Sequence, residues 1–352
     1  MTRQIAISLL SIIVVTVAGC MPQPAYTPTP TKTPDPSFIA VGDTSAGESD
    51  SVSTPIPTLT GAPTETPSLA PPSDTPSPTE TATETPEAGT ATIAPPTTDP
   101  NLPEAHYWFE RPIPTGWTDY LDRTYAYGST SGNQYRAHNG ADFWNPVSTP
   151  VVAVGNGTII YAGTDNQVQY GPTTGFYGNL IVVEMSNISY QGQPVYTLYG
   201  HLADIFVAEG EDVTTGQIIG GVGGTGIALG PHLHFEVRVG SSSDYFSSTR
   251  NPDLWIRPYW GFGTLAGRVV TTSGAYLREV ALTIRGPDAV RYTWTYAGDE
   301  NIPDTEWGEN FTYGDLPEGW YTVTTRSAQR SYSAEVFIGS RETTWLEFVF
   351  EE

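Results

Sequence analysis

Cysteine is almost missing from this chain of 352 residues, which has only Cys20. A single cysteine excludes intrachain disulfides and cysteine-rich metal sites, so any metal would need histidine and carboxylate ligands. Basic residues are also few, with 15 Lys and Arg against 38 Asp and Glu and a formal net charge of −23. Because no basic surface is available to neutralise phosphates, we expect no nucleic-acid partner.

Long apolar runs are scarce too, and the one at the start, Ile5–Val17, is shorter than the roughly 20 residues that span a bilayer. Arg3 precedes it, and small residues separate it from Cys20, which is typical of a secretion signal. The pattern resembles the lipobox of bacterial lipoproteins. That resemblance implies a signal peptide over residues 1–20, a lipid on Cys20 that anchors the chain to the bacterial cell membrane, and an extracytoplasmic location in the cell envelope. The alternative is an ordinary signal peptide with a coincidental cysteine.

The next segment lacks the residues that make a core. Residues 21–100 hold 18 of the 31 prolines, and Lys32 is their one basic residue against ten acidic ones. Such a composition cannot bury enough apolar surface to offset the entropy of ordering. We therefore predict a disordered Pro/Thr-rich linker over residues 21–102. At about 3.1 Å per residue, 80 extended residues would reach on the order of 250 Å, enough to search a nearby wall layer.

From residue 103 onward the composition changes to aromatic, glycine and β-branched residues. Short apolar runs such as Thr158–Tyr161, Leu180–Val183 and Val195–Leu198 are separated by turn residues. No long stretch has helical periodicity. This pattern predicts an all-β, antiparallel domain over residues 103–260.

A second β-rich segment covers residues 261–352. Apolar alternation marks Gly267–Val270 and Val280–Ile284, and a turn-like stretch, Gly314–Gly319, precedes Trp320–Val323. About seven short strands fit a small β-sandwich. The stretches "GTLAGRVVTTSG" and "DLPEGWYTV" resemble the carboxypeptidase-regulatory, transthyretin-like sandwich modules. The predicted fold class is therefore mainly β: an antiparallel β domain followed by a small β-sandwich, both after a disordered tether.

Four tryptophans of this segment have two interpretations. Their rings could stack on sugars, which would make the segment a carbohydrate-binding or wall-binding module. Alternatively they are core residues, which is the commoner role of aromatic side chains in small sandwiches. The four residues are Trp294, Trp307, Trp320 and Trp345.

Histidine is scarce as well, yet four of the five histidines fall within 97 residues. The motif "HNGADF" places His138 four residues before Asp142, "YGHL" contains His201, and "GPHLHFEV" contains His232 and His234. Such clustering of a rare residue indicates a common site. The fifth, His106, lies outside the motifs and is interpreted as a surface or core residue.

The last motif has a simple physical interpretation. Residues two apart on a β-strand share a face, so His232 and His234 should point into one cleft. One imidazole can bind a metal while the other serves as an acid–base group. His138 and Asp142 would add a nitrogen and a carboxylate oxygen. Two histidines and one aspartate leave a fourth tetrahedral position open, as catalytic zinc sites do.

The order His-x-x-x-Asp, Tyr-Gly-His-Leu and Gly-Pro-His-Leu-His-Phe-Glu resembles the lysostaphin-type (LytM-type) zinc endopeptidases over roughly residues 125–240. Carried over position by position, the resemblance implies that His138, Asp142 and His234 bind one zinc ion. His201 and His232 would be the catalytic pair. Which of these two acts as the base stays open.

The same resemblance implies the activity: a zinc-dependent endopeptidase that cuts peptide bonds of peptidoglycan stems or cross-bridges in cell-wall remodelling. The bond, a glycine bridge or a D-alanyl cross-link, is left open. The alternative is a non-catalytic regulator or wall-binding scaffold, but that class predicts missing ligands, and all are present here. Two segments, Thr164–Phe176 and Ser186–Pro194, are longer than in compact members and are expected to form loops at the cleft edge.

Overall fold

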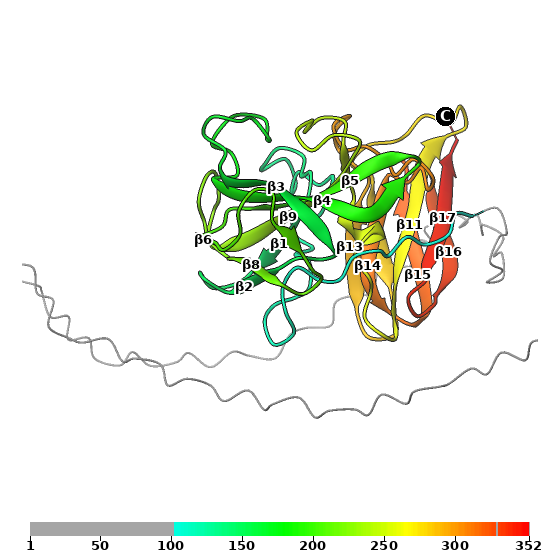
Figure 1. Cartoon of the computed structure of the whole chain (residues 1–352). Helices are drawn as coiled ribbons and strands as arrows, with labels where there is room; N and C mark the ends of the chain where they lie inside the picture. The colour runs from blue at the N-terminus through cyan, green and yellow to red at the C-terminus, as the bar shows by residue number, and fades with distance from the viewer. Residues whose placement is uncertain (1–101, 329, 352) are drawn as a thin grey trace, which may run out of the picture. The chain divides into compact units, whose positions relative to one another are not determined.

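The computed structural model describes residues 102–328 and 330–351. The predicted signal peptide, the lipid on Cys20 and nearly all of the predicted linker lie outside these residues. The described chain is almost entirely β, as predicted, and its only helical element is the 3₁₀ turn η1 (Pro252–Leu254) (Figure 1). None of its helical segments has the length and apolar character needed to cross a membrane.

The first part of the fold is built on a seven-stranded antiparallel sheet, in which β9 lies between β1 and β5. In spatial order the strands are β1 (Ala141–Trp144), β9 (His232–Val239), β5 (Gln193–Gly200), β4 (Asn179–Tyr190), β3 (Gly157–Thr164) and β7 (Asp212–Val213), with β10 (Thr249–Arg250) also paired to β9. A smaller sheet contains β2 (Pro150–Val152), β8 (Ile218–Gly221) and β6 (Asp204–Ile205). The three apolar runs identified in the sequence lie in β3, β4 and β5, as expected.

Strand β9 is buried along its whole length. Leu233, Phe235 and Val237 point into the main hydrophobic core of this part. The alternate positions, beginning with His232 and His234, are polar and equally buried. A strand with an apolar face and a buried polar face needs partners for every polar group, and these partners form the site described below.

One of the two long segments differs from the prediction. The first segment connects β3, which ends at Thr164, to β4 and forms no further strand, but Ser186–Pro194 is not a loop. It extends β4 and β5 into a longer hairpin that turns at Gln191 and Gly192, which both have positive φ. Alternating Ile188 and Tyr190 pack against the core, and this buried face keeps the chain extended.

The C-terminal strands form two sheets with a separate apolar cluster between them. One sheet contains β14 (Phe311–Pro317), β11 (Phe262–Thr271) and β17 (Thr343–Phe350); the other contains β13 (Val290–Trp294), β12 (Ala281–Arg285), β15 (Gly319–Arg326) and β16 (Ser331–Ile338). Strands β11 and β17 pair in parallel. The arrangement is that of a sandwich, and its relation to transthyretin-like modules stays a prediction.

The turn predicted over Gly314–Gly319 is wrong for most of its length, because β14 runs on to Pro317. Strand β14 lies at the edge of its sheet, where a proline is tolerated because its missing N–H faces no partner. The Asp315 carboxylate pairs with Arg111 at 2.6 Å. This ion pair helps to hold an otherwise turn-forming sequence in the sheet.

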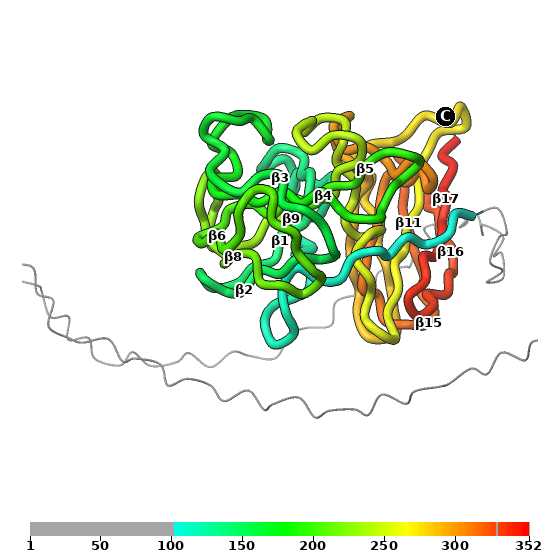
Figure 2. The backbone as a smooth tube through the Cα atoms, viewed as in Figure 1, coloured from blue at the N-terminus to red at the C-terminus, as the bar shows by residue number. Residues whose placement is uncertain are grey.

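Packing continues across residue 260, where the sequence suggested a boundary. Trp307, from the C-terminal part, belongs to the main apolar cluster of the first part. The Asn251 amide donates hydrogen bonds to the Tyr296 hydroxyl at 2.9 Å and to Thr312 Oγ1 at 2.8 Å. The first described segment, cyan in Figure 2, meets β17 through a 2.6 Å hydrogen bond between the side chains of Tyr107 and Thr343. The division into domains 103–260 and 261–352 stays a prediction.

A buried ion pair at this junction leads to a stability prediction. Arg123 donates to the Asp253 carboxylate at 2.7 Å and to the Gly314 carbonyl at 3.0 Å. Burial alone would raise the pKa of Asp253, but the Arg123 guanidinium holds it below its usual range. Asp253→Asn is expected to lower the free energy of unfolding at pH 7 by about 3 kcal/mol, because it leaves the Arg123 cation, whose side chain is 21% exposed, without its partner.

The pH dependence follows from the direction of that shift. The pKa of Asp253 is lower in the folded chain than the value of about 3.9 expected when unfolded, so its stabilisation is present at neutral pH and is lost as pH falls through the folded value. The difference between wild type and variant should shrink below about pH 4 in denaturant titrations. Glu347→Gln, which breaks the exposed pair with Arg268, is the control and should cost at most about 1 kcal/mol. An equal loss in both variants would contradict the prediction.

Candidate metal and catalytic centre

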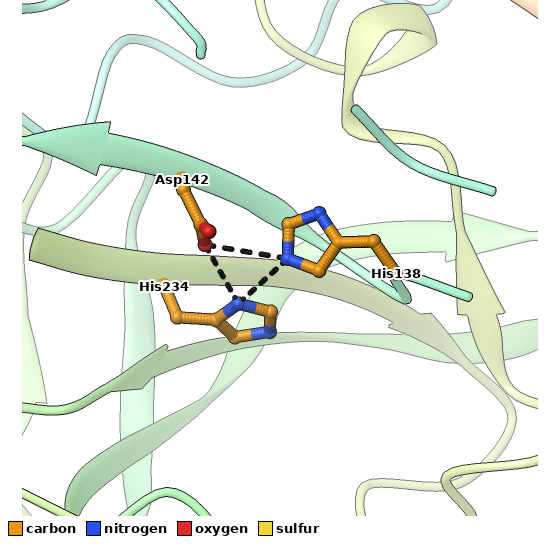
Figure 3. Close-up of side chains that lie close together, drawn as sticks. All are labelled: His138, Asp142 and His234. Carbon is orange, nitrogen blue, oxygen red and sulfur yellow. Dashed lines mark hydrogen bonds and ion pairs between the residues drawn. The ribbon is translucent and has the colours of Figure 1, made fainter. Parts of the chain in front are cut away.

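Three predicted ligands from two distant parts of the sequence meet in the structure. Pairing of β1 with β9 sets Asp142 opposite His234, and Asp142 Oδ1 lies 2.9 Å from His234 Nδ1. His138, in the loop before β1, places Nε2 3.1 Å from His234 Nδ1 and 3.3 Å from Asp142 Oδ1. The three ligand atoms lie within 4.8 Å of one another, and all three residues are buried (Figure 3).

The remaining nitrogen of each of these histidines is already engaged. His138 Nδ1 donates to the Tyr125 carbonyl oxygen at 2.6 Å, and the Tyr125 ring stacks on the imidazole at 4.2 Å. His234 Nε2 donates to Glu236 Oε1 at 3.0 Å. These bonds leave His138 Nε2 and His234 Nδ1 facing each other and Asp142, and each of these nitrogens offers a lone pair to a metal when its ring is neutral. Two imidazole nitrogens and a carboxylate oxygen facing one point fit a divalent transition metal such as zinc.

The charges of the cluster also suit a cation. Burial alone would raise the pKa of Asp142, but the facing His138 and His234 rings hold it well below its usual range. Burial likewise opposes protonation of His234, yet the carboxylates of Asp142 and Glu236 raise its pKa to about 9. Two carboxylates therefore flank one imidazole. In the absence of metal, His234 holds a proton whose positive charge faces these carboxylates. A bound metal ion would supply that positive charge instead.

The other two histidines of the motifs lie beside the cluster. His232 Nδ1 donates to the Gly230 carbonyl at 2.8 Å, and its Nε2 is 3.7 Å from Asp142 Oδ1. His201 Nδ1 donates to the Thr225 carbonyl at 2.8 Å, and the rings of His201 and His232 are 4.8 Å apart. Burial lowers the pKa of both imidazoles, that of His201 to about 3. Both rings are therefore neutral at pH 7, each with Nε2 as its basic nitrogen.

His201 has an unusual backbone conformation. Its φ is +61°, in the left-handed region that costs a non-glycine residue roughly 1 kcal/mol. Its N–H donates to the Tyr177 carbonyl at 2.8 Å, directly after β5 ends at Gly200. This turn directs the imidazole toward His232 rather than along the strand. This backbone strain is the energetic cost of placing the His201 ring at the site.

A cavity of about 520 Å³ opens beside the cluster and is lined by all five of these residues, from His138 to His234. Arg136 is the one lysine or arginine in its wall, and its guanidinium lies 5.0 Å from the centre of the Tyr245 ring. Asp122 lies in the wall as well, where it accepts a hydrogen bond from Trp144 Nε1 at 3.0 Å. A peptide with both a carboxylate and an amine would meet a group of opposite charge for each.

Three other residues with polar side chains make their contacts away from the cluster. His106 is buried among Trp108, Tyr190 and Trp255, with Nε2 3.3 Å from Asp304 Oδ2. The Tyr199 hydroxyl accepts a bond from Val154 N at 3.1 Å inside the core. The Asn179 amide donates to the Leu202 carbonyl at 3.1 Å. His106 is thus a core residue, one of the two interpretations given for it.

Residues 136–245 match the sequence profile of the family described as peptidase family M23. The chain carries a peptidase family M23 domain. All five clustered residues, from His138 to His234, lie inside the matched range.

Curated relatives of the M23 domain are found in several bacteria. The DD-carboxypeptidase/endopeptidase Mpg of Neisseria meningitidis is 39% identical over 105 residues, which are 30% of this chain and 21% of that protein. Lysostaphin of Staphylococcus simulans is 34% identical over 158 residues, 44% of this chain and 29% of lysostaphin. The peptidoglycan DD-endopeptidase ShyC of Vibrio cholerae is 40% identical over 106 residues, 30% of this chain and 21% of ShyC. The chain thus spans less than a third of the length of each of these relatives.

Among solved structures, the catalytic domain of lysostaphin from Staphylococcus simulans is 32% identical. The match covers 41% of this chain and 86% of that structure, with a TM-score of 0.28.

Two residues that support the M23 domain's cluster were missed from the sequence. Glu236 has no exposed surface; it receives hydrogen bonds from His234, from the Tyr177 hydroxyl and, at 2.7 Å, from Arg238 Nε. A signal was present, because residues 232, 234, 236 and 238 alternate on one strand face. Tyr125 gave no signal, since it contributes a main-chain carbonyl.

Replacing Glu236 tests this support. Glu236→Gln removes the charge that orients His234 and leaves Arg238 buried without its counter-ion. The zinc dissociation constant is expected to rise about 10- to 100-fold, the usual effect of losing a partner behind a metal ligand. The free energy of unfolding should also fall by about 3 kcal/mol or more. Chelator competition measures the first quantity and denaturant titration the second.

Tyr177→Phe is the matched control for that experiment. It removes another hydrogen bond to the same Glu236 oxygen but keeps the carboxylate and its bond to His234. Zinc affinity should change much less than in Glu236→Gln. Wild-type zinc affinity in Glu236→Gln would show that the carboxylate does not orient the ligand.

Proposed function

We propose that this chain is a zinc-dependent endopeptidase that hydrolyses peptide bonds of peptidoglycan stems or cross-bridges in cell-wall remodelling. The observation that carries the proposal is the convergence of His138, Asp142 and His234 in the wall of a cavity, next to two neutral histidines. The names of two relatives support it: Mpg is a DD-carboxypeptidase/endopeptidase, and ShyC is a peptidoglycan DD-endopeptidase.

The roles of the residues follow from their hydrogen bonds. His138, Asp142 and His234 would hold one zinc ion. When bound, zinc would act as a Lewis acid and lower the pKa of water, so that water can lose a proton at neutral pH and attack a peptide carbonyl. His201 and His232 keep Nε2 unprotonated at pH 7, so either can accept the proton of the attacking water. The imidazolium so formed can return the proton to the leaving amine. The rings of His201 and His232 are 4.8 Å apart, so both lie beside the same proton and the role of base is open to either.

Digestion of purified walls tests the proposal. The full chain, loaded with zinc, is incubated with peptidoglycan that has glycine bridges and with peptidoglycan that has direct D-alanyl cross-links. New amine termini and the masses of released muropeptides are measured. We expect release from one wall type, loss on chelation and recovery with zinc. A zinc-loaded protein that releases nothing from either wall would favour the alternative, a non-catalytic regulator or wall-binding scaffold.

The proposal includes the place of action. A lipid on Cys20 would anchor the chain to the outer side of the bacterial cell membrane, and the Pro/Thr-rich segment would carry the M23 domain to the wall. Both rest on the sequence pattern alone. Radiolabelled fatty acid incorporation into the wild type, compared with Cys20→Ala, would test the anchor.

Carbohydrate or wall contact by the C-terminal part is a weaker hypothesis. Trp307 is buried, and Trp345 is partly buried beside it, with ring centres 6.1 Å apart. Trp294 and Trp320 are 44% and 52% exposed. The register sets Trp294 level with Ala281 at one end of β12 and Trp320 beyond the other end, about 20 Å away along the strands. The two exposed rings therefore do not form one stacking platform.

A further inference from the structure

His138 is the one proposed ligand that no strand holds. Asp142 and His234 sit on β1 and β9 and face each other through the register of the sheet. His138 lies in the loop that precedes β1. Its place in the cluster therefore depends on Tyr125, which binds and stacks on its ring, and on the groups that bind its main chain.

Those groups come from both parts of the chain. The His138 N–H donates to the Ser129 carbonyl at 3.0 Å, and its carbonyl accepts from Gly128 N at 2.8 Å. The same carbonyl accepts from Asn301 Nδ2 at 2.7 Å, and this amide also donates to Asn139 Oδ1 at 3.1 Å. Asn301 is 3% exposed and belongs to the C-terminal part. One buried amide thus contacts the ligand residue and its neighbour.

The segment that carries Asn301 also fixes Gly128. This segment, Tyr296–Asn310, connects β13 to β14. Ala297 N donates to the Gly128 carbonyl at 2.9 Å. Gly128 has φ +78°, and a Cβ there would lie 2.3 Å from Tyr296 Cδ1, so the tyrosine ring occupies the space that any other residue would fill. Both residues that bind the His138 carbonyl are therefore placed by Tyr296–Asn310.

The segment is itself firmly anchored. Asp304 is fully buried, accepts a hydrogen bond from the Tyr190 hydroxyl and lies 3.3 Å from His106 Nε2. Trp307 is inserted into the main core of the first part. The Tyr190 contact comes from the hairpin extension that the sequence had suggested to be a cleft-edge loop. These anchors make the segment rigid enough to position what it touches.

We propose that the C-terminal part supports the metal site. Asn301 is the positioning residue, and its hydrogen bond to the His138 carbonyl holds His138 in reach of Asp142 and His234. The inference rests on the metal site of the proposed function, and it gives the C-terminal part a role other than spacing or wall contact. Without the Asn301 amide, the His138 carbonyl loses one of its two hydrogen-bond donors. The loop before β1 can then adopt positions in which His138 Nε2 leaves the cluster.

The test uses two variants of the full chain that remove the same chemical group. Asn301→Ala removes the amide that contacts His138. Asn310→Ala removes a buried amide of the same segment whose bonds all stay within the C-terminal part, to the main chains of Val269 and Leu277. The zinc dissociation constant is measured by competition with a chromophoric chelator, the absorption spectrum of the cobalt-substituted protein is recorded, and stability is measured by denaturant titration.

We expect Asn301→Ala to raise the zinc dissociation constant about tenfold and to change the cobalt spectrum, as disturbed support of a metal ligand does. Asn310→Ala should lose stability but keep both metal readouts. The proposal is overturned if Asn301→Ala binds zinc like wild type with an unchanged spectrum, or if Asn310→Ala raises the constant by the same factor. Wild-type protein that binds zinc but cuts no wall would overturn the proposed function alone, because these metal readouts do not depend on hydrolysis.

Discussion

Asp142→Ala should abolish zinc binding at micromolar concentrations and lower the rate of wall hydrolysis about a thousandfold or more. Asp142 is the one carboxylate among the three proposed ligands, and its Oδ1 faces three imidazoles. A bound metal contributes several kcal/mol to the transition state of peptide hydrolysis, and each 1.4 kcal/mol is a factor of ten. Metal content after dialysis and the rate of release of amine termini are the two measurements.

Asp122→Ala is the matched control for this experiment. Asp122 lines the same cavity, but its carboxylate binds Trp144 Nε1 and the Thr124 hydroxyl instead of the cluster. The variant should keep one zinc ion per chain. A full zinc content in Asp142→Ala, or an equal loss in Asp122→Ala, would show that the cluster is not the metal site.

The second large effect is expected from the two histidines beside the cluster. His201→Ala and His232→Ala should each lower kcat by about 10²- to 10⁴-fold while the zinc content stays at the wild-type level. Their Nδ1 atoms are bound to the carbonyls of Thr225 and Gly230, so each ring offers only Nε2 to a reacting group. Steady-state kinetics on a soluble peptide, together with metal analysis, separate this loss from loss of zinc.

The double variant makes that prediction sharper. If His201 and His232 act on the same proton or the same developing charge, His201→Ala combined with His232→Ala should cost little more than the worse single change. Independent roles would give multiplied losses instead. If both single variants retain wild-type kcat, neither histidine takes part in the mechanism. If one of the variants loses zinc, the histidine replaced in it is a metal ligand.

The part of the site that strands carry was predictable from the sequence. The alternation in "HLHFEV" places His232 and His234 on one face of β9, and the structure has them there. The pairing of β1 with β9 was not predictable, because it joins residues about 90 positions apart and depends on the whole sheet. The family resemblance supplied that juxtaposition. Sequence spacing also could not show whether His232 or His234 faces Asp142 through Nδ1. That orientation depends on the side-chain hydrogen bonds of each histidine.

Elsewhere the local pattern was misleading for identifiable reasons. The Gly314–Gly319 stretch has turn-forming composition, but pairing with β11 continues to Pro317 across a bulge at which Asp315 has φ +55°. The tryptophans of the C-terminal part looked alike in the sequence, although Trp307 is buried and Trp320 is half exposed. The contact between Asn301 and His138 spans 163 positions and involves a main-chain carbonyl, which no motif records. Contacts of this kind depend on tertiary structure alone.

The parallel pairing of β11 with β17 has a consequence for the order of folding. Strand β17 ends at Phe350, and its register runs along β11 from Thr264 to Thr271. Leu346, Phe348 and Phe350 all enter the C-terminal core. That core therefore closes only after β17 has been synthesised, and a nascent or clipped chain ending before β17 would lack it. Contacts of such large sequence separation also make folding slow.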